Sequence, residues 1–297
     1  MNDQKLTGVL PALVTPFDDK ANVNPSAIEK LVAYFLSKKV DGFYVCGSTG
    51  QGLWMSTEER KLVANTVIDA VAGAVPVIVH VGCVAPAEAA KLTVHASGAG
   101  AAGISSIIPP SYEDLDALHA YFSMLSAHAP DLPLLPYFMG STIPPIEVMA
   151  KLADVPTVAG TKYTGPNMFE MTRIIEMGTA SWSVFSGMDE QCVFGAMCGA
   201  DGAIGSSVNV IPGVYREIRR LVADNKQREA YTFQKKANRV ITVLKSYGYA
   251  GALKAALGML GIECGDPKLP APPFDRARTE QIKSDLSAVD FEELSSM

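Results

Sequence analysis

The chain has few of the residues that build disulfide frameworks or metal sites. Its 297 residues include five cysteines, an odd number, and no two of them form a CxxC pair. This count favours free thiols in a reducing compartment over a disulfide framework. The four histidines are scattered, with no HxH or HExxH motif, so we expect no metal ion at the functional site.

The sequence also lacks long runs of one charge or of apolar residues. Strongly basic runs are absent and the formal net charge is −6, which argues against a general nucleic-acid binder. No apolar run approaches the length of a membrane span, and the opening "MNDQKLTG" has no apolar signal region. We therefore expect a cytoplasmic protein that neither binds nucleic acid nor enters a membrane.

The chain does contain a regular alternation of two kinds of segment. Hydrophobic residues make up 48% of the sequence, which is enough to bury a large core. Short apolar runs that do not alternate in polarity are typical of parallel strands covered on both faces. Eight such runs are candidate strands, over residues 8–17, 42–47, 75–82, 103–109, 132–138, 157–162, 183–187 and 201–206.

Longer helical patterns fill the gaps between these runs. Asn24 or Ser26 is the expected N-cap of the first helix. Ser56 and Glu59 form a capping box at the start of the second helix, and Gly73 would end it. Alternation sustained about eight times predicts an α/β fold, a closed (β/α)8 TIM barrel, with a doubly wound open sheet as the alternative.

Three helical segments follow the last candidate strand without further strand signals. We interpret the first as the eighth barrel helix and the others as a C-terminal helical extension. Residues 1–225 would then form the barrel, and residues 226–297 the extension packed on it as one structural unit. The Pro-rich stretch "DPKLPAPPF" near 266–274 is expected to be a surface connection before a final helix.

A barrel carries its chemistry at the carboxyl ends of its strands. Lys162 ends the sixth candidate run, "TVAGTK". It is either an ammonium that reaches solvent or an amine that forms a Schiff base. The second interpretation is possible because apolar surroundings lower the pKa of an amine, and the neutral amine has a free lone pair. Tyr137 ends the fifth run. It is either a core residue with a wet hydroxyl or a phenol that moves protons for a neighbouring imine.

A Gly-rich loop, "GSTGQG" (47–52), follows the second candidate strand. It is an ordinary turn or a carboxylate cradle, made of backbone N–H groups and the hydroxyls of Ser48 and Thr49. The similar "GAGAAG" (98–103) matches GxGxxG, but it follows a helix and precedes a strand, the reverse of the dinucleotide-binding arrangement. We interpret that second stretch as a helix stop and a turn.

Polar residues also follow the last two candidate strands. Asp189 and Glu190, in "SGMDE", either supply favourable charges at a helix start or bind several hydroxyls of a polyol. Ser206, the last residue of the eighth candidate strand, is placed to contact the same ligand.

The motifs "GSTG", "HVGC", the tyrosine after the fifth strand, "GTK", "SGMDE" and "GADGAIGS" occur in this order at successive strand ends. On these motifs the chain resembles the N-acetylneuraminate lyase and dihydrodipicolinate synthase superfamily of pyruvate-dependent barrel aldolases, over nearly its whole length. The resemblance implies a small-molecule substrate, no external cofactor and a homotetramer.

The resemblance also implies a role for each matching residue. Lys162 would form a Schiff base with the keto carbon of the substrate, and Tyr137 would transfer protons there. Ser48 and Thr49 would hold the pyruvate carboxylate, while Tyr112 would reach across a subunit interface to a hydroxyl relay. The residues expected to bind the rest of the substrate are Thr164, Gly187, Asp189, Glu190 and Ser206.

The motifs favour the N-acetylneuraminate lyase branch. Dihydrodipicolinate synthases typically carry an arginine after the strand-five tyrosine, whereas "YFMGSTIPP" contains no cation to grip a second carboxylate. The chain departs from the lyases at Phe138-Met139-Gly140, where they read Asn-x-Pro, and at Gln51, where the family has glutamate. Both departures border the acceptor end of the pocket.

We therefore expect a Schiff-base aldolase that reversibly cleaves a 2-keto-3-deoxy sugar acid. N-acetylneuraminate, giving N-acetylmannosamine and pyruvate, is the first choice of substrate. The alternatives are a related aldolase or dehydratase for another 2-keto acid, of the 2-keto-3-deoxygluconate or dihydrodipicolinate type, and a catalytically silent barrel that binds a keto acid.

Overall fold

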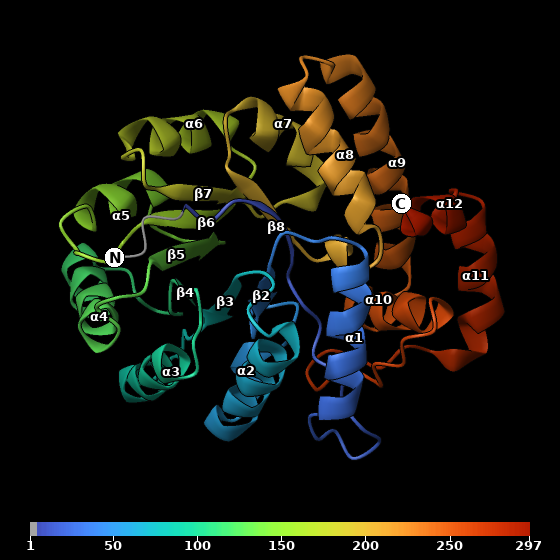
Figure 1. The fold of residues 1–297 in the computed structure, drawn as a ribbon, viewed down its shortest axis with the longest axis horizontal. Helices are drawn as coiled ribbons and strands as arrows, with labels where there is room; N and C mark the ends of the chain where they lie inside the picture. Colours follow the sequence, from blue (N-terminus) through green and yellow to red (C-terminus); the bar gives the residue numbers. More distant parts are fainter. Residues whose placement is uncertain (1–4) are drawn as a thin grey trace.

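The computed structural model describes residues 5–297. Eight parallel strands lie in the order β1-β8-β7-β6-β5-β4-β3-β2. The two outer strands of this order are joined as well, by a parallel bridge between Ala12 and Tyr44 and by the Leu13 N–H, which donates to the Tyr44 carbonyl (2.9 Å). The sheet therefore closes, and the expected (β/α)8 barrel is confirmed (Figure 1). The strands are β1 (Gly8–Pro11), β2 (Phe43–Val45), β3 (Val77–His80), β4 (Gly103–Ile107), β5 (Leu134–Met139), β6 (Gly160–Thr164), β7 (Ser183–Ser186) and β8 (Gly202–Gly205).

The observed strands differ in length from the apolar runs that predicted them. β1 stops at Pro11, although Ala12 and Leu13 still pair with neighbouring strands. The Val14 N–H then donates to the Asn209 side chain at 3.1 Å instead of to a strand. In contrast, β6 continues to Thr164. Lys162 is thus the middle residue of its strand rather than the last, and Thr164 is one pleat nearer the mouth of the barrel.

The outer ring of the barrel is formed by helices that follow the strands. They are α1 (Pro25–Ser37), α2 (Thr57–Val71), α3 (Pro86–Gly98), α4 (Leu115–His128), α5 (Pro145–Lys151), α6 (Met168–Met177), α7 (Cys192–Met197) and α8 (Pro212–Ala223). Asn24 is the N-cap of α1, and the capping box of Ser56 and Glu59 is present at α2. α2 ends at Val71, and its C-cap Ala72 (φ 48°) and the following Gly73 (φ 76°) both adopt the left-handed conformation, so Gly73 lies at the helix stop as expected.

Apolar side chains form two layers of core. The larger layer lies between the strands and the surrounding helices. The smaller layer fills the inside of the barrel and consists of Leu6, Leu10, Ala12, Tyr44, Ile78, Leu135, Phe185 and Ile204. A filled interior leaves the carboxyl ends of the strands as the place for a functional site.

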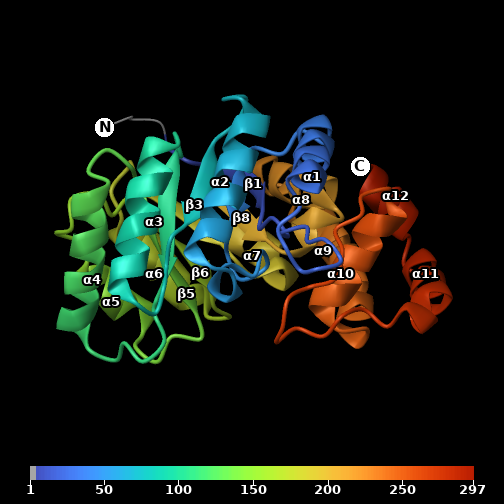
Figure 2. The same ribbon diagram turned by 90° about the horizontal axis from the view of Figure 1, so that it is seen from below.

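Beyond α8 the chain forms α9 (Gln227–Ser246), α10 (Tyr249–Met259), α11 (Thr279–Ser287) and α12 (Phe291–Ser296). α9 runs beside α8, and α10 to α12 lie at one side of the barrel (Figures 1 and 2). The Pro-rich stretch 266–274 is an irregular connection, as expected, but two short helices follow it instead of one. The division into residues 1–225 and 226–297 stays a prediction. No helix within residues 5–297 is long and apolar enough to cross a membrane.

Candidate active site

Lys162 and Tyr137 lie next to each other inside the barrel. Their Cα atoms are register partners in the β5–β6 ladder. The Lys162 Nζ lies 4.2 Å from the centroid of the Tyr137 ring and 4.3 Å from that of Tyr44. Only 4% of Lys162 is exposed. Burial lowers the pKa of Lys162, and the neighbouring Tyr137 and Asp189 partly oppose this shift. The side chain is therefore not the solvent-exposed ammonium of the alternative interpretation.

Two aromatic side chains that sequence reasoning missed complete the surroundings of the amine. Tyr44, His80 and Tyr137 pack with ring centroids 6.2 to 6.3 Å apart. His80 Nε2 accepts the Ile107 N–H at 3.0 Å. Burial and then the charges of Arg60 and Lys162 lower the pKa of His80 well below its ordinary value, so this imidazole is neutral. Tyr44 occurs in an apolar run with no sequence signal that separated it from ordinary core residues, whereas His80 opens the "HVGC" motif, to which no role was given.

The phenol of Tyr137 faces one of the positions at which this chain departs from the lyase pattern. Its hydroxyl donates to the Sδ of Met139 at 3.1 Å. Met139 is the last residue of β5 and is 44% exposed. A thioether is a weak acceptor, so this contact leaves the phenol available to a bound molecule.

Thr164 and Gly187 define a small space beside the amine. The Oγ1 of Thr164 is buried and has no hydrogen-bond partner among the residues that the structure describes. A Cβ at Gly187 would lie 1.9 Å from that oxygen and 3.2 Å from the Cε of Lys162. The glycine keeps this space open, and the Thr164 hydroxyl is a polar group that a ligand can satisfy.

The Gly-rich loop and the end of β8 meet at the barrel mouth. Thr49 Oγ1 and Ser206 Oγ are 2.6 Å apart, so two residues expected on different parts of the ligand are direct neighbours. The neighbouring Ser48 is half-buried. Gly50 supports the loop through its carbonyl, which accepts the Thr15 hydroxyl at 2.7 Å. The Thr49 and Ser206 hydroxyls thus form one polar pair at the mouth.

Asp189 and Glu190 point in different directions. They belong to a short 3-10 turn, Asp189–Gln191, just before α7. The buried Asp189 carboxylate accepts both the N–H and the hydroxyl of Ser207 at 2.7 Å. Burial raises the pKa of Asp189 to about 6, against the lowering effect of those hydrogen bonds. The Glu190 carboxylate instead pairs with Lys245 of α9.

Tyr112 lies in the loop after β4. Its ring packs edge to face against Tyr121, with centroids 5.5 Å apart. The expected relay with Ser48 and Tyr137 across a subunit interface stays a prediction.

The hydrogen bonds of Gln51 explain why this chain has an amide at the position where the family has a carboxylate. Its Nε2 donates to the Lys268 carbonyl (2.7 Å), and the Lys268 N–H donates to its Oε1 (2.9 Å). Glutamate can accept but cannot donate in such a pair. The Pro-rich connection is thus fastened to the Gly-rich loop of the site.

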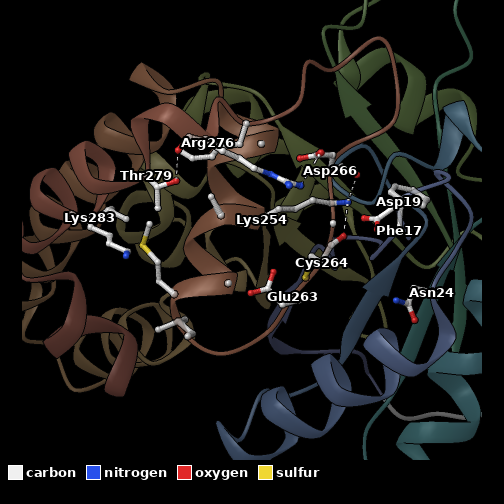
Figure 3. Close-up of a pocket in the computed structure, with 18 of the residues that line it drawn as sticks. Phe17, Asp19, Asn24, Lys254, Glu263, Cys264, Asp266, Arg276, Thr279 and Lys283 are labelled. Carbon is white, nitrogen blue, oxygen red and sulfur yellow. Dashed lines mark hydrogen bonds and ion pairs between the residues drawn. The ribbon is translucent and has the colours of Figure 1, made fainter.

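A separate cavity of about 1070 Å³ lies between the barrel and the extension (Figure 3). It contains a second buried lysine, Lys254, whose Nζ donates to the carbonyls of Cys264 and Asp266, both at 3.2 Å. Burial lowers the pKa of Lys254 to about 8. Lys162 does not line this cavity. The two buried lysines therefore have different surroundings, and only Lys162 has a phenol beside it.

The sequence matches the dihydrodipicolinate synthetase family over residues 5–289. The chain belongs to this family. The family resemblance found in the motifs is thereby confirmed.

Relatives of this dihydrodipicolinate synthetase family member span nearly its whole length. It is 33% identical over 292 residues to the N-acetylneuraminate lyase of Rhizobium meliloti (strain 1021), covering 96% of each chain. The wild-type sialic acid aldolase of Ruminococcus gnavus superposes with a TM-score of 0.93 at 28% identity, covering 98% of this chain and 100% of the other. A form of that aldolase with its catalytic lysine mutated superposes equally well (TM-score 0.93, 27% identity, 98% of each chain). This family member is accordingly an enzyme of the lyase class.

Proposed function

We propose that the enzyme reversibly cleaves a 2-keto-3-deoxy sugar acid to pyruvate and an aldehyde through a Schiff base on Lys162, with N-acetylneuraminate as the first substrate to test. The observation that carries this proposal is a buried amine beside a phenol inside the barrel. The family relationship supports it, because one of the superposed aldolases is described as having a catalytic lysine.

The proposed reaction starts at the amine. Burial favours the neutral form of Lys162, which attacks the keto carbon. The Tyr137 phenol gives its proton to the departing hydroxyl of the carbinolamine, so that water leaves and an iminium and the Tyr137 phenolate are formed. The iminium withdraws electrons from the adjacent carbon–carbon bond. The Tyr137 phenolate takes the proton of the C4 hydroxyl as this bond breaks, which leaves an aldehyde and the enamine of pyruvate. Protonation of the enamine and hydrolysis release pyruvate and restore the amine.

The rest of the substrate would be held by the polar groups of the barrel mouth. Ser48 and Thr49 would bind the keto-acid carboxylate together with backbone N–H groups. The unpartnered hydroxyl of Thr164 supports a ligand beside Lys162. The other groups proposed to contact the sugar chain are Gly187, Asp189, Glu190 and Ser206. We also propose a cytoplasmic homotetramer that needs no external cofactor, in which Tyr112 serves a neighbouring subunit.

Trapping with borohydride tests the imine. The protein is incubated with pyruvate, reduced, digested and mapped by mass spectrometry. We expect the adduct on Lys162 and none on Lys254, which serves as an internal control because it is a buried lysine with a lowered pKa but no neighbouring phenol. A missing adduct at Lys162 would refute the aldolase, and an adduct without turnover would indicate a silent binder.

A second candidate is a sister enzyme for another 2-keto acid, such as 2-keto-3-deoxygluconate. It is favoured by the segment after Tyr137, where Phe138 replaces the asparagine expected in the lyases and the Tyr137 hydroxyl contacts the thioether of Met139. Pyruvate release from N-acetylneuraminate and from 2-keto-3-deoxygluconate is measured side by side. Cleavage of the second compound alone would replace the first choice of substrate.

A further inference from the structure

One face of α9 holds the turn that carries Asp189 and Glu190. Gln234 is fully buried. Its Oε1 accepts the Val193 N–H (2.9 Å), and its Nε2 donates to the Asp189 carbonyl (2.9 Å) and to Asn238 Oδ1 (2.8 Å). The Gln234 side chain thus connects α9 to the backbone at the start of the turn and to the backbone just after it.

Two further residues of α9 hold Glu190. The Nδ2 of Asn238 donates to the Glu190 carbonyl at 3.2 Å. The ammonium of Lys245 pairs with the Glu190 carboxylate. The spacing of Gln234, Asn238 and Lys245 is four and then seven residues, which places them along one face of the helix. The backbone and the side chain of Glu190 are therefore both fixed by α9.

Packing alone does not require these residue types. A buried amide loses its hydration and is tolerated only when its hydrogen bonds are made, whereas an apolar side chain would fill the same volume without that cost. Here the partners of the Gln234 amide are the carbonyl of Asp189 in the turn, the N–H of Val193 in α7, and Asn238, which itself bonds to the turn. The arrangement leaves the Asp189 carboxylate bonded to Ser207 and the Glu190 carboxylate paired with Lys245.

We infer that Gln234, Asn238 and Lys245 are positioning residues that set the affinity of the enzyme for the hydroxyl-bearing part of its substrate. This inference rests on the proposed function, because it assumes that the Asp189–Glu190 turn contacts the sugar chain. It assigns the extension a role in substrate selection, although none of the three residues needs to touch the reacting atoms.

Lys245 gives the sharpest test because it is exposed. Its side chain is 57% exposed, so Lys245→Met is expected to fold normally. The variant should raise the KM of the sugar acid about fivefold or more, while the rate of pyruvate trapping on Lys162 stays within about twofold, and Lys245→Arg should restore the KM. Lys236→Met is the matched control, since Lys236 is on the same helix but pairs with Glu293.

Gln234→Met tests the buried part of the contact, because it keeps the length of the side chain and removes its hydrogen bonds. We expect a lower melting temperature and a raised KM for the sugar acid, with pyruvate trapping retained. If this variant does not fold, the comparison of Lys245→Met with Lys245→Arg still tests the positioning role.

Failure of the positioning role can be distinguished from failure of the proposed aldolase function. An unchanged KM in Lys245→Met, or an equal loss of trapping and cleavage, would overturn the positioning role while leaving the aldolase proposal intact. Wild-type protein that does not trap pyruvate would overturn both.

Discussion

The Nζ of Lys162 lies over the face of the Tyr137 ring, 4.2 Å from its centroid, and the two residues are Cα partners on adjacent parallel strands. Parallel register projects both side chains to the same side of the sheet, here into the barrel. The ring faces of Tyr137 and Tyr44 attract the ammonium, while burial favours the free amine. The net effect is a lowered pKa of Lys162. The amine therefore lies beside the phenol in a form that can attack a keto carbon.

Tyr137→Phe removes the phenolic hydroxyl and keeps the ring. Because the ring still packs against His80 and Tyr44, the melting temperature should change little. Without the proton acceptor, kcat for cleavage should fall by about 10²- to 10⁴-fold. Tyr121→Phe is the matched control, since it removes a buried hydroxyl that contacts Ser106 at 3.0 Å. Equal activity of the two variants would contradict the role given to Tyr137.

Gln51→Glu restores the residue that is usual in the family. It keeps an acceptor for the Lys268 N–H but places a carboxylate oxygen against the Lys268 carbonyl. We expect the free energy of unfolding to fall by about 1–3 kcal/mol, and proteolysis within 266–274 to become faster. Denaturant titration and limited digestion measure these effects. Gln227→Glu, the same change at an exposed position, is the control and should leave both quantities unaltered.

The strand pattern was sufficient to place Lys162 and Tyr137 on neighbouring strands of a parallel barrel, although both lie within their strands rather than at the ends. Contacts between distant parts of the chain were not predictable in this way. Thr49 meets Ser206 across 157 positions. The amide of Gln234 and the carbonyl of Asp189, 45 positions apart, meet only because α9 packs against the turn. A polar side chain in an apolar or helical pattern does not reveal such a partner before the tertiary structure is known.

The buried carboxyl of Asp189 predicts a pH dependence of stability. Its pKa rises from 3.8 to about 6 on folding, so the folded protein holds this proton more tightly than the unfolded chain does. The resulting stabilisation is complete below about pH 4, is lost as the pH rises through about 6, and amounts to at most about 3 kcal/mol. Denaturation midpoints from pH 4 to 7 should fall less in Asp189→Asn than in the wild type. Parallel curves would show that Asp189 does not titrate in this range.

Gly187→Ala tests whether the space beside Lys162 is needed. A methyl group at this position would lie 1.9 Å from Thr164 Oγ1, so the Thr164 side chain must move towards the place of the ligand. We expect kcat/KM to fall by about 100-fold or more, equivalent to about 2.7 kcal/mol or more of transition-state stabilisation. Gly98→Ala is the control, because a Cβ there meets no atom within 4 Å. If Gly187→Ala trapped and cleaved substrate like Gly98→Ala, the ligand would have to lie elsewhere in the barrel mouth.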